Sequence, residues 1–386
     1  MDKATSPFSA LGISDAFLSV LTDENYSDPT PIQLAAIPAV LFGKDILGIA
    51  KTGSGKTASY VLPVLQRWDE AKWTLKNRHV PVLVLVPTRE LAVQVETVFN
   101  LLAQGLATRP KVMAVFGGVS INPQMIGMQD VQVLIATPGR LLDLIDSKAV
   151  HLAQVQVLVL DEADKMLDLG FKEEMDRVLA LLPRKRQNLL FSATLSNAVN
   201  EITQLVLHKP EVIQVTDEPQ EVQLIEQRAF RVEPERKGPF LRYLIRSMDM
   251  HQVLVFTSSS HSADHVADKL SKHGIEAEAV HGKKSNHARL GTLARFKAGK
   301  LRVLVATDLL SRGIDIEALP YVINYELPRS PKDYVHRIGR TGRAERSGMA
   351  FTLVTPEDQP HFKVIQKKMK QWLTLEGTDD VDLKSV

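Results

Sequence analysis

Eight consecutive residues, Ala50-Lys51-Thr52-Gly53-Ser54-Gly55-Lys56-Thr57, have the composition of a loop that binds phosphate groups. They follow the apolar run Ile46–Ile49 and precede a predicted helix that extends to about Leu65. Glycines let backbone N–H groups converge on an anion, and the start of a helix adds further N–H donors. Lys56 would contact the β- and γ-phosphates of a nucleoside triphosphate, and the Thr57 hydroxyl would bind Mg²⁺. We therefore predict a nucleotide site here.

Two acidic residues, Asp161 and Glu162, end the apolar run Val157–Leu160. A carboxylate beside a phosphate loop can hold Mg²⁺ together with water and phosphate oxygens, and we assign this role to Asp161. Glu162 is the candidate general base that orients and deprotonates the attacking water. Acidic residues also begin many helices for purely electrostatic reasons, so the pair alone leaves that structural interpretation open.

A basic cluster spans His336-Arg337-Ile338-Gly339-Arg340-Thr341-Gly342-Arg343. Guanidinium groups bind phosphate oxygens through paired hydrogen bonds and stay charged. An arginine that enters from a second body can stabilise the charge on a transferred γ-phosphoryl group. A solvated basic turn and a hydrogen-bonded structural histidine are the alternatives for this cluster taken by itself.

The elements that must position these groups are short, continuous runs of Val and Leu, which are typical of parallel strands buried on both faces. In the first half the runs cover residues 82–86, 112–115, 133–135, 157–160 and 189–191. Ligands bind beyond the carboxyl ends of the strands in open α/β sheets, so the groups after these runs should share one edge. The groups are Pro87-Thr88-Arg89-Glu90, Gly117-Gly118, Thr137-Pro138-Gly139-Arg140, Asp161–Asp164 and Ser192-Ala193-Thr194.

The alternation pauses at Val215–Glu221, a polar and acidic stretch with a proline, which we interpret as a linker between domains. It then restarts with runs at residues 253–256, 277–280, 303–306, 321–324 and 351–354. Thr307-Asp308 and Arg312–Asp315 again follow a run. Because this half has no phosphate loop of its own, we predict two α/β lobes with nucleotide held mainly by the first.

Composition excludes several classes of protein. The chain of 386 residues has no cysteine, so a disulfide framework, a zinc ribbon and an iron–sulfur site are excluded. No apolar run approaches the roughly 20 residues needed to span a bilayer, and the first residues lack the pattern of a signal peptide. We expect a cytoplasmic protein without membrane contact. Residues 213–372 carry 26 Lys and Arg against 19 Asp and Glu, which suggests an anionic partner such as nucleic acid or simply a solvated surface.

In their order along the chain, from Phe8 to Arg343, these motifs resemble those of the DEAD-box ATP-dependent RNA helicases of helicase superfamily 2. The resemblance implies an α/β fold of two tandem RecA-like lobes, each a mostly parallel sheet flanked by helices, joined by a short flexible linker. It divides the chain into a Q-motif segment (1–34), an ATP-binding lobe (35–212), a linker (213–224), a C-terminal lobe (225–372) and a short acidic tail (373–386). It also implies ATP and Mg²⁺ as cofactors, and RNA bound through its backbone with low sequence specificity.

The resemblance assigns roles to individual residues. Gln33, in Pro29-Thr30-Pro31-Ile32-Gln33, would read the adenine edge, and Phe8 would stack on its ring. Asp315 would lie near the ribose, and Arg340 and Arg343 would contact the γ-phosphate. The residues that would couple ATP state to RNA are Ser192, Ala193, Thr194 and His336. The residues that would hold RNA are Pro87, Thr88, Arg89, Gly117, Gly118, Thr137, Pro138, Gly139, Arg140, Thr307, Asp308 and Arg312.

Two departures from the family pattern stand out. Asn286 precedes Arg289 by three residues where family members often carry Gln, and Leu310-Ser311 replaces a small pair before Arg312. The resulting hypothesis is RNA-stimulated ATP hydrolysis coupled to lobe closure and to local, non-processive unwinding of short duplexes or remodelling of RNA–protein complexes (RNPs). The alternative is an ATP-gated RNA clamp or assembly scaffold. A DNA-translocating helicase is disfavoured by the Q motif and by Asp161–Asp164. We expect a monomer, with RNP or ribosome-assembly proteins as candidate partners.

Overall fold

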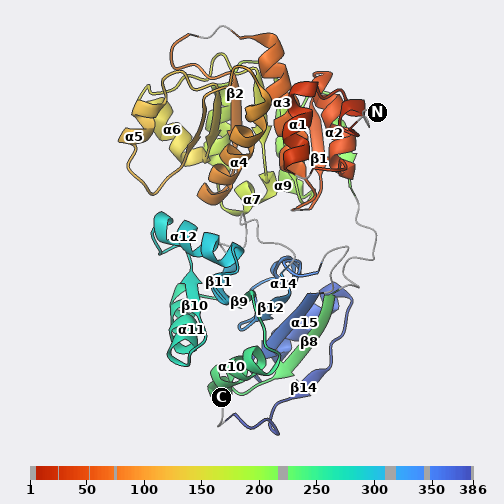
Figure 1. Cartoon of the computed structure of the whole chain (residues 1–386), viewed down its shortest axis with the longest axis vertical. Helices are drawn as coiled ribbons and strands as arrows, with labels where there is room; N and C mark the ends of the chain where they lie inside the picture. Colours follow the sequence, from red (N-terminus) through yellow and green to blue (C-terminus); the bar gives the residue numbers. More distant parts are fainter. Residues whose placement is uncertain are drawn as a thin grey trace. The chain divides into compact units, whose positions relative to one another are not determined.

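The computed structural model describes residues 6–24, 26–51, 53–73, 76–215, 225–308, 319–342 and 348–383. The chain divides into two compact units, Met1–Thr216 (lobe 1) and Asp217–Val386 (lobe 2), which are drawn in Figure 1. Each lobe contains one sheet of seven strands, and the strand pairs are parallel. The predicted fold of two α/β lobes is therefore confirmed. Within the described residues, no helix combines the length and the apolar character needed to cross a membrane.

The sheet of lobe 1 has the strand order β3-β4-β2-β5-β6-β1-β7. Its strands are β1 (Ile46–Ile49), β2 (Val82–Leu85), β3 (Val112–Val115), β4 (Val133–Ala136), β5 (Val157–Leu160), β6 (Gln187–Ser192) and β7 (Glu211–Gln214). The helices are α1 (Asp15–Asp23), α2 (Pro31–Leu41), α3 (Lys56–Ala71), α4 (Arg89–Leu102), α5 (Asn122–Gly127), α6 (Pro138–Asp146), α7 (Ala163–Asp168), α8 (Lys172–Ala180) and α9 (Asn197–Val206), with short 3₁₀ turns at Ser9–Leu11 and Ala103–Gly105.

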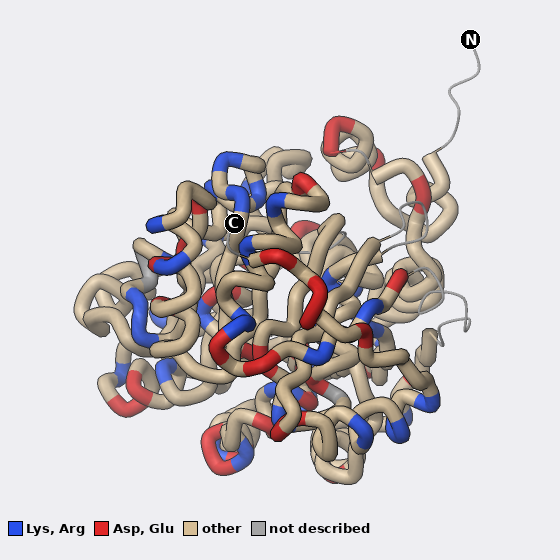
Figure 2. Tube along the Cα trace, turned by 90° about the horizontal axis from the view of Figure 1, so that it is seen from below, with Lys and Arg blue, Asp and Glu red and all other residues tan. Residues whose placement is uncertain are grey.

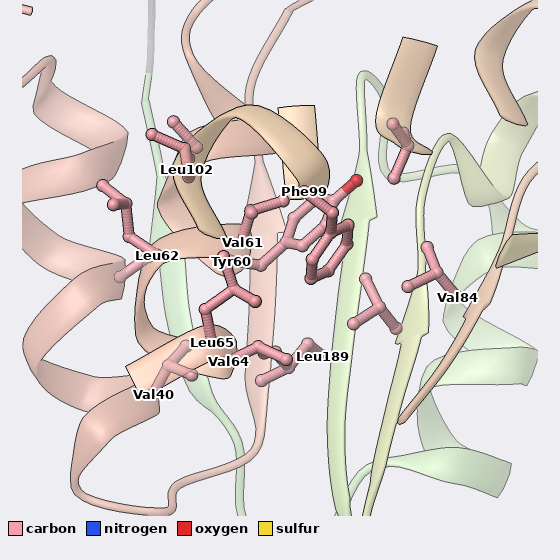
Figure 3. Close-up of a cluster of buried hydrophobic side chains, with 14 of the residues drawn as sticks. Val40, Tyr60, Val61, Leu62, Val64, Leu65, Val84, Phe99, Leu102 and Leu189 are labelled. Carbon is pink, nitrogen blue, oxygen red and sulfur yellow. The ribbon is translucent and has the colours of Figure 1, made fainter. Parts of the chain in front are cut away.

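The central strands are buried on both faces because helices cover both sides of the sheet. Val82 and Val84 of β2 face one apolar cluster, whereas Leu83 and Leu85 face another, as the period of two along a strand requires. Figure 3 shows the first cluster, in which Tyr60 of α3 and side chains of α4 pack over the strands. Two buried faces explain why the strands appear in the sequence as unbroken apolar runs.

The sheet of lobe 2 has the strand order β10-β11-β9-β12-β13-β8-β14. Its strands are β8 (Ile225–Arg231), β9 (Val253–Thr257), β10 (Ala277–Val280), β11 (Val303–Thr307), β12 (Tyr321–Asn324), β13 (Gly348–Val354) and β14 (Leu375–Gly377). The helices are α10 (Lys237–Ser247), α11 (Ser260–Lys272), α12 (Asn286–Lys297), α14 (Pro331–Ile338) and α15 (Gln359–Met369), with a 3₁₀ turn at Pro234–Arg236. As in lobe 1, alternate residues of the central strand β9 face different apolar clusters.

The acidic segment 373–386 is partly built into lobe 2. Strand β14 forms the edge of the sheet and pairs with β8, and Glu376 accepts two hydrogen bonds from Arg228 of β8. Val381 and Leu383 pack against the apolar cluster that contains Phe230 of β8. The acidic side chains of this segment therefore neutralise a basic sheet edge. Elsewhere, Lys and Arg are interspersed with Asp and Glu along the trace (Figure 2).

Candidate active site

The carboxyl edge of the lobe 1 sheet carries two adjoining groups of predicted site residues. Strands β3, β4 and β2 are neighbours, and each is followed by residues predicted to hold a nucleic-acid backbone. Strands β5, β6 and β1 are the next neighbours, and they are followed by Asp161-Glu162, Ser192-Ala193-Thr194 and the predicted phosphate loop. The strand order thus brings together groups that lie far apart in the sequence and sorts them into two halves of one edge.

The predicted phosphate loop connects β1 to α3. Gly53 and Gly55 have φ values of 77° and 87°, in the left-handed region where a glycine avoids strain. A Cβ on Gly55 would lie 2.6 Å from Gln33 Nε2, so the packing there also requires glycine. Lys56 is buried, and its ammonium group donates to the carbonyl of Ala50 across the loop. Burial lowers the pKa of Lys56, and the charges of Asp161 and Glu162 oppose that effect.

Gln33 connects the Q-motif segment to the phosphate loop. Its Nε2 donates to the Gly55 carbonyl over 3.2 Å, and its Oε1 accepts from the Thr30 N–H over 2.9 Å. The Thr30 hydroxyl donates to the carbonyl of Ser54, so the capping box of α2 also fixes the loop. Phe8 is fully buried, with its ring edge-on to Tyr26. The roles of Gln33 and Phe8 toward adenine stay predictions.

Replacing Gln33 by Ala is expected to weaken ATP binding and to reduce discrimination between ATP and GTP. A site that hydrogen-bonds the edge of one base rejects a base with another donor–acceptor pattern. The measurement is the affinity for ATP and GTP of wild type and variant without RNA. Gln66→Ala is the matched control, because Gln66 bonds the Gly12 carbonyl and the Ser14 N–H rather than the loop. Equal use of GTP and ATP by the wild type would contradict the adenine assignment.

Asp161 is positioned by a residue that the sequence analysis did not identify. The hydroxyl of Tyr60, on the second turn of α3, donates to Asp161 Oδ2 over 2.9 Å. The other oxygen, Oδ1, is buried and has no hydrogen-bond partner among the residues that the structure describes. Burial, followed by the adjacent Glu162 charge, raises the pKa of Asp161 to about 6, while Lys56 and Tyr60 act in the opposite direction. A buried carboxylate oxygen without a partner, close to a phosphate loop, fits the donor set of Mg²⁺.

Glu162 occupies a strained position at the start of α7. Its φ of 53° is unusual for a residue with a side chain, which is a frequent feature of functional sites. Glu162 Oε1 pairs with the Lys165 ammonium at 2.5 Å, and Oε2 is buried without a hydrogen-bond partner. Both side chains of the pair are almost fully enclosed by protein.

A hydrogen bond links Asp164 to the residues after β6. Thr194 Oγ1 donates to Asp164 Oδ2 over 3.0 Å, and the hydroxyl of Ser192 donates to the Thr194 carbonyl over 2.8 Å. The structure therefore joins Ser192-Ala193-Thr194 directly to the acidic group. The further assignment of these residues to coupling stays a prediction.

Two of the residues predicted to bind RNA in lobe 1, Arg89 and Gly118, lie against each other. A Cβ on Gly118 would lie 2.7 Å from the Arg89 guanidinium, so that glycine leaves room for the arginine. Arg140 donates to the carbonyl of Val119 over 2.9 Å and approaches Asp143 at 3.2 Å. Thr88 and Thr137 are the N-cap residues of α4 and α6. Arg89, Arg140 and the starts of α4 and α6 therefore lie on one edge, although Arg140 is buried and already bonded.

The carboxyl edge of the lobe 2 sheet borders a cleft of about 600 Å³. Thr307 and Asp308, predicted as RNA-binding residues, line it together with three residues that the sequence analysis missed, Ser258, Lys283 and Arg329. Ser258 directly follows the strand β9, so the rule that selected the other groups would have selected this one as well.

Arg337 is enclosed by protein and bonded to other residues, so it is not available to a ligand. It is fully buried, forms a bidentate pair with Asp308 and stacks on the ring of Phe256 at 4.9 Å. It also donates to the carbonyl of Glu326 over 2.6 Å. Arg337 therefore links the ends of three strands. Both carboxylate oxygens of Asp308 accept hydrogen bonds from it.

Several predicted site residues lie outside the described residues. These are Thr52, Arg312, Asp315 and Arg343, and the Leu310-Ser311 departure lies outside them as well. Arg340 and His336 are described: Arg340 is buried, and His336 is half-buried on α14. Their roles stay predictions.

Comparison with known proteins follows the same division of the chain. Residues 30–202 match the DEAD/DEAH box helicase family, and residues 236–345 match the helicase conserved C-terminal domain. The ATP-dependent RNA helicase CshA of Listeria monocytogenes is 37% identical over 94% of this chain and 69% of its own. The ATP-dependent rRNA helicase rrp3 of Emericella nidulans is 39% identical over 91% of this chain and 74% of its own.

A solved structure gives the same answer. S. cerevisiae Dbp5 bound to RNA and ADP BeF3 matches with a TM-score of 0.83 and 29% identity, over 97% of each chain. The phosphate loop, the paired acids of Asp161–Asp164 and the two parallel sheets now have a common explanation. The chain belongs to the DEAD-box family of ATP-dependent RNA helicases.

Proposed function

We propose that the chain couples RNA-stimulated ATP hydrolysis to closure of its two lobes on RNA, and that closure opens short duplexes locally without processive movement. The observation that carries this proposal is the division of the lobe 1 edge into a phosphate-loop half and an arginine-bearing half on adjacent strands. One rigid sheet then presents nucleotide and RNA contacts to the same partner lobe. The names of the relatives, and the RNA and ADP BeF3 bound to Dbp5, support it.

In the proposed cycle, lobe 1 binds the nucleotide first. The loop N–H groups and Lys56 hold the phosphates, and Thr57 and Asp161 would hold Mg²⁺, which would neutralise charge on the phosphate oxygens. Glu162 orients the attacking water and accepts its proton. Lobe closure then brings Arg340 and Arg343 to the γ-phosphate, so hydrolysis depends on closure.

RNA binding supplies the second condition for closure. Arg89, Arg140 and the starts of α4 and α6 contact the backbone of one strand, which gives little sequence preference because phosphate contacts carry no base information. A strand bent by both lobes cannot stay paired with its complement, so a short duplex opens. Hydrolysis separates the lobes and releases the strand.

Lobe closure can be measured with two thiol labels, because the chain has no native cysteine. Lys185→Cys in lobe 1 and Lys300→Cys in lobe 2 change exposed residues. We expect a broad distance distribution that narrows only when RNA and a non-hydrolysable ATP analogue are both present. Asp23→Cys with Lys185→Cys, both in lobe 1, is the control and should not respond. If the distribution of distances between the two lobes does not change when both ligands are added, the mechanism is contradicted.

Unwinding assays separate the proposal from the alternative of an ATP-gated clamp. Local opening predicts strand release that slows steeply with duplex length, while ATP turnover stays constant. A clamp predicts a long-lived ATP-bound RNA complex with little strand release at any length. Stimulation of ATP turnover by single-stranded DNA as strong as that by RNA would instead favour the DNA-translocating class.

A further inference from the structure

A groove separates α10 and α11 on one face of the lobe 2 sheet, and both helices are labelled in Figure 1. Its volume is about 480 Å³, within the range of small-molecule sites and much larger than one phosphate ion needs. Leu241 of α10 and Val266 and Leu270 of α11 give it an apolar floor. We call it the α10–α11 groove. It shares no residue with the carboxyl-edge cleft of lobe 2 or with the predicted nucleotide and RNA groups.

The polar residues that line the α10–α11 groove are mainly basic. Arg242, Lys269 and Lys272 face a single acidic lining residue, Glu235, so the lining carries two net positive charges with neutral histidines. The imidazoles of His265 and His273 also border it. This concentration of positive charge contrasts with the mixed charges over most of the trace. The groove therefore favours an anionic ligand.

Arg242 is the most informative of these residues. Arg242 is only 8% exposed, and within the described part of the chain its buried Nε has no hydrogen-bond partner. Among the described residues, no carboxylate pairs with it, whereas the buried Arg337 has Asp308. Burial and the neighbouring Arg246 both lower the pKa of Arg242, and Tyr325 acts in the opposite direction. An unpaired buried charge costs stability, so this position is unfavourable unless an anion joins it.

We propose that the α10–α11 groove binds a small organic phosphate, a molecule with a phosphate monoester and an apolar or aromatic part. The planar guanidinium of Arg242 can bind two phosphate oxygens at once, and Lys269 and Lys272 add charge at the rim. The apolar floor would contact the uncharged part of the ligand. This site goes beyond the proposed helicase function and does not depend on it.

The test measures thermal unfolding of the full chain with phenyl phosphate, inorganic phosphate or benzyl alcohol at constant ionic strength. We expect phenyl phosphate to stabilise at lower concentrations than inorganic phosphate, by about 2–4 °C at ten times its Kd. Benzyl alcohol, which lacks the charge, should not stabilise. If inorganic phosphate binds as strongly as phenyl phosphate, the proposal that the ligand has an apolar or aromatic part is overturned.

Two variants locate the site. Arg242→Met should abolish the stabilisation by phenyl phosphate and should leave the free protein at least as stable as wild type, because it removes an unpaired buried charge. Lys56→Ala, which disables the phosphate loop, should retain the stabilisation. The reverse pattern would place the ligand in the nucleotide site and overturn the proposal. Loss of stability of ligand-free Arg242→Met would show a structural role for Arg242 and would also overturn it.

A pair of exposed lysines keeps the test independent of folding. Lys269→Ala with Lys272→Ala should weaken phenyl phosphate binding about tenfold without changing ligand-free stability. Lys367→Ala with Lys368→Ala, exposed residues of α15, is the matched control and should bind normally. The same unfolding measurement with an acidic peptide, hexaglutamate, tests whether the groove binds a protein instead. Arg242-dependent stabilisation by hexaglutamate but not by phenyl phosphate would assign the groove to a protein partner and overturn the small-molecule ligand.

Discussion

Glu162→Gln is expected to lower RNA-stimulated ATP turnover by about 10²–10⁴-fold, the usual contribution of a general base, while ATP still binds. Glutamine keeps the size of the side chain and an oxygen that can accept from Lys165, so the strained start of α7 should persist. It cannot accept the proton of the attacking water. The change therefore separates the chemical step from nucleotide binding.

The measurement combines turnover at saturating RNA with the lifetime of the ATP-bound RNA complex. We expect that lifetime to lengthen, because release follows hydrolysis in the proposed cycle. Lys56→Ala should instead lose both turnover and the complex, since it removes the charge on the phosphates. Glu173→Gln, an exposed residue of α8, controls for the loss of one carboxylate. Near-normal turnover in Glu162→Gln would remove Glu162 from the base role.

Strands buried on both faces were predictable because their residues need only apolar neighbours. The run Val157–Leu160 coincides with β5, and the run at 82–86 exceeds β2 by one residue. The first residues of β6, Gln187 and Asn188, were missed because they are polar. Both are buried, and Asn188 Nδ2 donates to Asp45, 143 residues away. No local pattern can reveal a partner at that distance.

Strands β7 and β8 escaped prediction for a related reason. The edge strand β7 has an intermediate or exposed residue at three of its four positions, so it lacks an apolar run. Strand β8 contains Arg228 and Arg231, whose charges are neutralised by Glu376 and Asp379 near β14. The sequence analysis separated an acidic tail from the C-terminal lobe, whereas the fold pairs β14 of that tail with β8.

The candidate site divides in the same way. Motif order and the rule of carboxyl strand ends predicted which groups share the lobe 1 edge, and contacts such as that between Thr194 and Asp164 confirm the grouping. Residue types alone did not distinguish the arginines within the cluster 336–343; the family resemblance assigned Arg340 and Arg343 to the γ-phosphate and gave Arg337 no role. Arg337 is buried against Asp308, and this depends on packing between distant strands.

Arg343→Ala is expected to lower RNA-stimulated turnover by about 10³-fold, if Arg343 acts as other arginine fingers do. Its charge should matter chiefly in the transition state, where negative charge spreads over the γ-phosphoryl oxygens. ATP affinity without RNA should change little, because the proposed contact forms only on closure. Arg343→Lys should not restore turnover, since an ammonium lacks the planar fork of the guanidinium.

Arg337→Ala is the matched control, because it removes another arginine of the same cluster, one that is fully buried and paired with the half-buried Asp308. That change should destabilise the protein by about 3 kcal/mol or more, whereas Arg343→Ala should leave the unfolding midpoint unchanged. Turnover with saturating RNA, ATP affinity without RNA and urea unfolding together separate the two roles. If Arg343→Ala loses ATP affinity without RNA, or keeps wild-type turnover, then Arg343 is structural. The γ-phosphate contact would then rest on Arg340 alone.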